Sequence, residues 1–70
     1  MTTETTIESA IERSISHNEI VRVNVDDIQA ARDTAGLIAD ECDSAMENDG
    51  SLDVWGALNG SDFRIRIVAE

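Results

Sequence analysis

The stretch LDVWGALNGSDFRIRI, from Leu52 to Ile67, decides the fold that we expect. Apolar and polar residues alternate on both sides of Asn59 and Gly60. This dipeptide is the strongest short-range signal for a two-residue type I′ turn between antiparallel strands. The turn also sets the register, which places Leu52 opposite Ile67. The sequence therefore predicts a β-hairpin with a defined pairing.

The same register divides the hairpin into two faces. One face is apolar and points toward the expected core. On the other face Asp53 lies opposite Arg66, and Trp55 lies opposite Arg64. Such cross-strand pairs each contribute roughly 0.2–1 kcal/mol. Trp55 is the only tryptophan in a chain with one phenylalanine and no tyrosine, so its role is the main functional question.

Three further elements are predicted before the hairpin. Isoleucines at helical spacing predict a short amphipathic helix over residues 5–17, and strict alternation predicts a half-buried strand over residues 20–25. From Ile28 to Ala45 the apolar residues step by three and four, which predicts one long helix of about five turns. Gly50 would supply its left-handed end.

This order of elements, α-β-α-β-β, predicts an α+β two-layer sandwich formed by a single domain over residues 1–70. A three-stranded sheet would carry both helices on one face. If the crossover between parallel strands is right-handed, the last strand is expected in the centre, antiparallel to both neighbours. Arg22, on the first strand, would then join Arg64 and Arg66 on the open face.

The charge of the chain is its most unusual global feature. Fifteen Asp and Glu residues stand against five basic residues, all of them arginine, and the net charge is −10. Such a surface repels phosphate, which argues against direct binding to nucleic acid or to an anionic membrane. The Asp-rich, lysine-free composition resembles that of small acidic proteins of extreme halophiles, in which molar salt screens the self-repulsion.

A second interpretation makes the acidity itself functional. The outer side of the long helix would carry four carboxylates in a row that imitates the phosphates of nucleic acid: Asp33, Asp40, Asp43 and Glu47. In size and acidity such a chain is similar to the small decoy proteins of phages and mobile elements, including some anti-CRISPR proteins. This hypothesis predicts an inhibitor of a nucleic-acid-binding protein.

Catalytic and metal chemistry are not expected. His17 is the only histidine and lies at a helix end, no G-x-S-x-G elbow surrounds Ser14, and Cys42 belongs to the apolar stripe. The chain shows no phosphate loop, dinucleotide fingerprint or zinc-ligand spacing, so no cofactor is expected. No apolar run is long enough to span a membrane, and the acidic N-terminus is unlike a signal peptide, which predicts a cytoplasmic protein.

The open sheet face gives the preferred functional hypothesis, a non-enzymatic interaction domain. Trp and Arg are enriched at binding hot spots, and a core this small supplies only about 3–5 kcal/mol on its own. Trp55, Arg22, Arg64 and Arg66 are therefore predicted to contact a second copy, as in a homodimer, or another protein. Such a partner would bring acidic groups to the arginines. The alternative role for Trp55 is local packing under the arginine stems.

Overall fold

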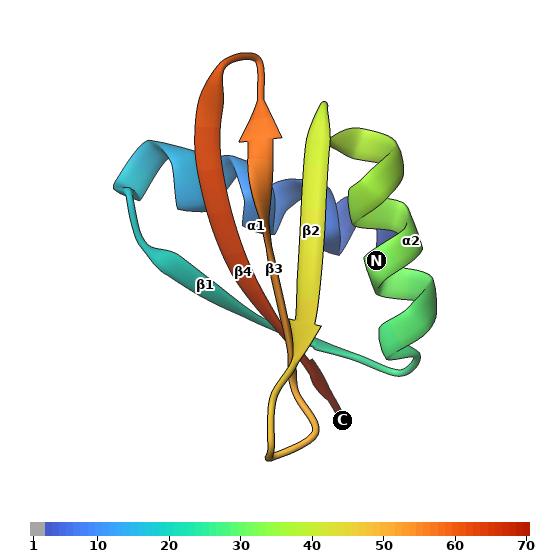
Figure 1. Cartoon of the computed structure of the whole chain (residues 1–70). Coiled ribbons are helices and arrows are strands. Elements are labelled where there is room, and N and C mark those ends of the chain that lie inside the picture. Colours follow the sequence, from blue (N-terminus) through green and yellow to red (C-terminus); the bar gives the residue numbers. More distant parts are fainter. Residues whose placement is uncertain (1–2) are drawn as a thin grey trace.

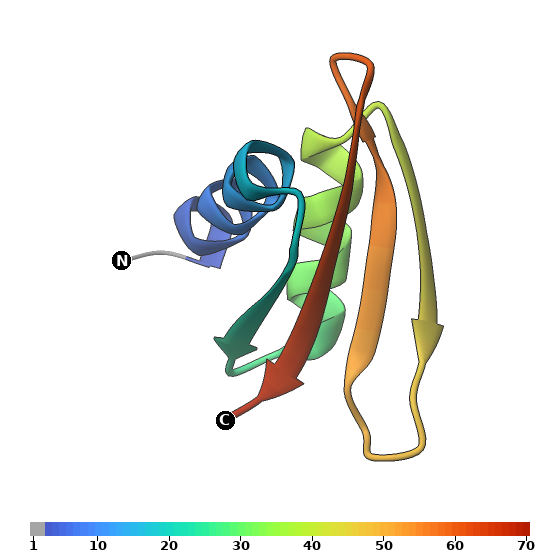
Figure 2. The same ribbon diagram turned by 90° about the vertical axis from the view of Figure 1, so that its left-hand side faces the viewer.

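A computed structural model describes residues 3–70 of the chain. The elements, in chain order, are α1 (Thr3–His17), β1 (Ile20–Val25), α2 (Ile28–Ile38), β2 (Glu41–Met46), β3 (Leu52–Leu58) and β4 (Ser61–Ala69) (Figure 1). The strands form one mixed sheet in the order β1-β4-β3-β2, and both helices lie on the same side of it (Figure 2). The predicted α+β class is confirmed, with four strands in place of three.

The prediction of one long helix from Ile28 to Ala45 is wrong. α2 ends at Ile38, and Ala39 has an extended backbone with ψ of 150°. The chain then forms β2, which pairs antiparallel with β3. Its sequence ECDSAM contains Cys, Asp and Ser in succession, all weak helix formers. As a strand, this segment satisfies the hydrogen-bonding groups along one side of β3, and tertiary pairing therefore overrides the helical spacing.

Gly50 lies in the turn between β2 and β3 and does not end a helix. The backbone N–H of Glu47 donates to the carbonyl of Ser51 at 2.8 Å, and Gly50 has a φ of 89°. The carboxylate of Asp49 accepts from the Ser51 backbone N–H at 2.9 Å and from its hydroxyl at 2.6 Å. This turn joins the extra strand to the predicted hairpin.

The hairpin itself forms as predicted. Leu52 pairs with Ile67, and every other pair of β3 and β4 keeps that register. The positive φ angles of Asn59 (53°) and Gly60 (80°) suit a type I′ turn. β4 occupies the interior of the sheet, as expected, but it is parallel to β1 and not antiparallel. The reason is the added strand, because α2 now connects β1 to β2, and β3 reverses the chain before β4 begins.

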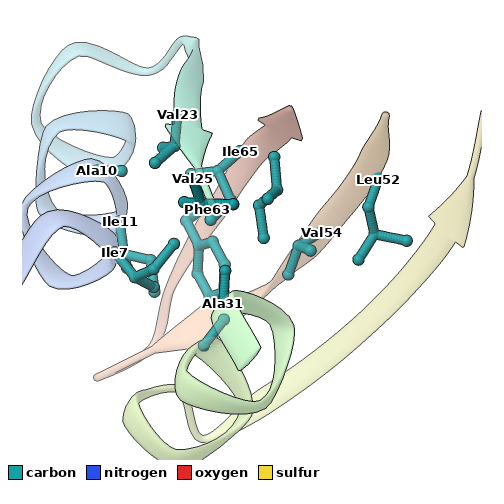
Figure 3. Close-up of a cluster of buried hydrophobic side chains, with 12 residues drawn as sticks. Ile7, Ala10, Ile11, Val23, Val25, Ala31, Leu52, Val54, Phe63 and Ile65 are labelled. Carbon is teal, nitrogen blue, oxygen red and sulfur yellow. The ribbon is translucent and has the colours of Figure 1, made fainter. Parts of the chain in front are cut away.

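The core lies between the helices and the inner face of the sheet. Ile7 and Ile11 from α1 belong to one buried cluster with Val54 and Ile65 from the sheet, and all four side chains are fully buried (Figure 3). Ala31 of α2 is also fully buried, and its small side chain lets that helix approach the sheet closely. The core thus occupies one face of the sheet only.

Neither helix in residues 3–70 has the length and apolar character needed to cross a membrane.

Ser14, in the last turns of α1, ties this helix to the sheet and is predicted to stabilise the fold. Its side chain is buried, and its hydroxyl accepts from the backbone N–H of Arg64 at 2.9 Å. The same hydroxyl can donate its single proton to the carbonyl of Glu19, 2.7 Å away, or to that of Arg64, 2.9 Å away. Because Ser14→Ala leaves these groups without a partner, we expect the free energy of unfolding to fall by about 1–3 kcal/mol. Urea denaturation checks this, with Ser16→Ala as the exposed control. Equal effects of the two substitutions would refute the role.

Candidate protein interface

On the outer face of the sheet, opposite the helices, the side chains of paired positions form rows that run across the four strands. Each such row is called a level. Across one level the register places Ile20 of β1, Arg64 of β4, Trp55 of β3 and Asp43 of β2 side by side. Neither helix covers this face (Figure 2). The side chains on it are therefore free to meet a partner or one another.

The next level contains a carboxylate clamped by two arginines. Asp53 is only 2 % exposed although it stands on the outer face. Arg66 donates from Nε to its Oδ1 at 3.0 Å, and Arg64 donates from Nη2 to its Oδ2 at 3.3 Å. Arg22 of β1 lies beside Arg66 in the sheet. Asp53 thus offsets positive charge where three arginines would otherwise crowd together.

Glu47, at the start of the β2–β3 turn, is electrostatically coupled to Asp53. A hydrogen bond between the two carboxyl groups holds the pKa of Asp53 below its usual range, and the hydrogen bond from Arg66 acts in the same direction. The same carboxyl hydrogen bond and the negative charge of Asp53 raise the pKa of Glu47. The two groups therefore titrate as a pair, in which Glu47 binds a proton more readily than Asp53 does.

Trp55 lies in an open hollow of about 570 Å³ and is 38 % exposed. Residues of β2, β3 and β4 line this hollow: Glu41, Asp43, Trp55, Gly56, Asp62, Phe63 and Arg64. Arg64 stands opposite Trp55, as predicted, but its guanidinium is bonded to Asp53. The hollow therefore contains one exposed aromatic side chain next to an arginine whose charge is already partnered.

Three exposed carboxylates surround this hollow. Glu41 and Asp43 project from β2, and Asp62 projects from β4. None of the three forms an ion pair with any residue in the described part of the chain. Sequence reasoning missed Glu41 because its segment was assigned to a helix. Asp62 could have been found, since it lies two residues before Arg64 and so on the same face of the strand.

The structure brings the four predicted interface residues to one face. Trp55, Arg22, Arg64 and Arg66 all stand on the outer side of the sheet. Because Asp53 already binds Arg64 and Arg66, Arg22 is the one of these three arginines without an ion pair to a side chain of residues 6–70. The expectation that a partner brings acidic groups to the arginines stays a prediction, and among the three arginines it now applies most directly to Arg22.

The alternative acidic surface does not form a row on one helix. Asp33 is on α2, but Asp40 lies between α2 and β2, where its Oδ2 accepts from the backbone N–H of Asn59 at 2.9 Å. Asp43 is on β2 and lines the hollow, and Glu47 follows that strand. The predicted row required one helix from Ile28 to Ala45. Because α2 ends at Ile38, the four carboxylates lie on different elements.

The described residues were also considered for metal binding and for the state of the cysteine thiol. Among the described residues, no group of three or more His, Cys, Asp and Glu side chains is placed to hold a metal ion. Cys42 is a half-buried free cysteine, and burial raises the pKa of its thiol. Comparison with protein-family models, curated proteins and solved structures returned no match for the chain. The functional proposal therefore rests on the geometry of the outer face.

Proposed function

We propose that this chain is a small, non-enzymatic interaction domain that associates with another protein, or with a second copy of itself, through the outer face of its sheet. The observation that carries the proposal is Trp55, an indole exposed in a hollow on the face that the helices leave open. Trp is the residue type most enriched at binding hot spots, and such residues act from pockets that a partner can seal from water.

Two features of the outer face favour an interface over local packing of the indole. The guanidinium of Arg64 is directed to Asp53 by a hydrogen bond, so it is not a free cover for the indole. Ile20, on the same level of the sheet, is 54 % exposed. Burial of both apolar side chains by a partner would add stability that a domain this small can use.

The proposal predicts that association depends on Trp55. Sedimentation equilibrium at about 0.1 M and about 2 M KCl measures self-association with and without repulsion between the net charges of −10. We expect Trp55→Ala to weaken any association at least about tenfold, as loss of a hot-spot residue does. Leu37→Ala is the matched control, because Leu37 is 88 % exposed but belongs to α2.

The outcomes of this test separate the two kinds of partner. A dimer at high salt that Trp55→Ala dissociates and Leu37→Ala leaves intact would support self-association. A wild-type monomer at both salts would leave a different protein as the partner. Association that survives Trp55→Ala, or that Leu37→Ala weakens equally, would count against the outer face.

The other hypothesis, an acidic mimic of nucleic acid, depended on a row of carboxylates that the chain does not form. Its remaining support is the net charge of −10, which is a property of the whole surface.

We also propose a cytoplasmic location, since a free thiol such as that of Cys42 suits a reducing compartment.

A further inference from the structure

Resting on the proposed function, we infer that the hollow beside Trp55 receives an arginine or lysine side chain from a partner protein. The inference names the chemistry of the partner, which the proposed function leaves open. It rests on three properties of the hollow: an exposed indole, unpaired carboxylates around it, and an arginine that is already bound to a carboxylate.

The indole provides an aromatic surface for a cation. Among the aromatic side chains, tryptophan binds ammonium and guanidinium groups over its ring best. Trp55 keeps 38 % of its surface exposed, and it stands in a hollow of about 570 Å³. That volume lies within the range of sites that hold small ligands and exceeds the needs of one side chain. The residues flanking the basic side chain can therefore enter as well.

The charges around the indole select a cation over an anion. Glu41, Asp43 and Asp62 line the hollow without an ion pair in residues 3–70. Arg64 also lines it, but Asp53 binds this guanidinium at 3.3 Å. The net charge at the site is therefore negative. A guanidinium or ammonium group over Trp55 would donate charge-assisted hydrogen bonds to carboxylates on both neighbouring strands.

A basic protein complements this surface better than a second copy does. Each copy carries a net charge of −10, so two copies repel each other at low salt. On the outer face only Arg22 could offer a free guanidinium, judged by the ion pairs of the described residues. A partner with a basic segment would instead be attracted over long range and held at the site.

The test titrates the protein with a short synthetic peptide of alternating arginine and serine, and follows the fluorescence of Trp55. Because this is the only tryptophan, its signal reports on the hollow directly. A peptide with citrulline in place of arginine has nearly the same shape without the charge. We expect a saturable change with the arginine peptide and none with the citrulline peptide.

Two triple variants show whether the binding is local. The site variant Glu41→Gln, Asp43→Asn, Asp62→Asn removes the carboxylates of the hollow. The control variant Glu8→Gln, Glu12→Gln, Asp26→Asn removes the same formal charge from other exposed positions. We expect affinity for the arginine peptide to fall roughly tenfold or more in the site variant and about twofold in the control. Circular dichroism verifies that both variants fold.

Either of two results would overturn the inference: no saturable response to the arginine peptide, or equal losses in the two triple variants, which would mean diffuse attraction to an acidic protein. The proposed function fails separately. If the arginine peptide does not bind but Trp55→Ala still dissociates a dimer, the outer face is an interface and only its preference for a basic partner is wrong.

Discussion

Gly56→Ala is expected to disrupt the edge of the sheet and to lower the free energy of unfolding by about 4 kcal/mol or more, a large effect for one methyl group. A Cβ at this position would overlap the main-chain carbonyl of Glu41 and come within 3.0 Å of the Cα of Cys42. These are backbone atoms of β2, which cannot move without breaking the pairing of β2 with β3. β2 can therefore pair with β3 at this position because residue 56 has no side chain.

Gly36→Ala is the matched control for this prediction. Gly36 lies in α2, it is exposed, and an added Cβ would meet no atom within 4 Å. Alanine is favoured over glycine in a helix by up to about 1 kcal/mol, so this variant should be slightly more stable than the wild type. Urea denaturation of both variants checks the pair. A Gly56→Ala protein as stable as the wild type would mean that β2 does not pack against Gly56 as described.

Asp53→Asn is expected to lower the free energy of unfolding by roughly 1–3 kcal/mol at neutral pH. The substitution keeps the shape of the side chain but removes the charge that holds Arg64 and Arg66 at 3.3 and 3.0 Å. Arg64 and Arg66 would lose their shared carboxylate, and Arg22 lies next to Arg66, so three positive groups would remain close together. The effect stays moderate because the Asp53 side chain is only 3 % exposed but the side chains of Arg64 and Arg66 are 52 % and 42 % exposed.

The stabilisation of the fold by the Asp53 carboxylate should depend on pH in a defined direction. The pKa of Asp53 is lower in the folded protein than in the unfolded chain. The stabilisation is therefore fully present above the unfolded pKa of about 3.9, and it is lost as the pH falls through the folded value. The difference in stability between wild type and Asp53→Asn should shrink below about pH 4. A difference that stays constant into strong acid would show that the charge of Asp53 is not what stabilises the fold.

Glu47→Gln provides the matching control, because the contribution of Glu47 to stability should change with pH in the opposite direction. Folding raises the pKa of Glu47, so the stabilisation by its protonated form is present in acid and is lost as the pH rises through that folded pKa. At neutral pH the ionised Glu47 repels Asp53. A glutamine keeps a donor for Asp53 without the charge, so this variant should be more stable than the wild type at neutral pH and equal to it in acid.

The hairpin could be predicted in detail because a two-residue turn leaves no freedom of register. Once Asn59 and Gly60 form the turn, alternation along β3 and β4 assigns every side chain to a face. This is why the placement of Trp55, Asp53 and the arginines was correct. The same local rule holds for β1, whose alternation is equally regular.

The fourth strand could not be predicted from spacing alone. Cys42 and Ala45 continue the helical period of α2, and six residues are too few to separate that period from strand alternation. The stronger signal was the turn sequence Asn48, Asp49 and Gly50, which is typical of a hairpin as well as of a helix end. The acidic half of the candidate interface depends on β2, so it was missed along with the strand.

NMR chemical-shift mapping of the arginine–serine peptide on the wild-type protein tests the central claim most directly, that the hollow beside Trp55 binds a basic side chain of a partner. The account predicts that the perturbed signals cluster on β2, β3 and β4 and include the indole N–H of Trp55. Perturbations centred on α1 and α2, or none at saturating peptide, would contradict it.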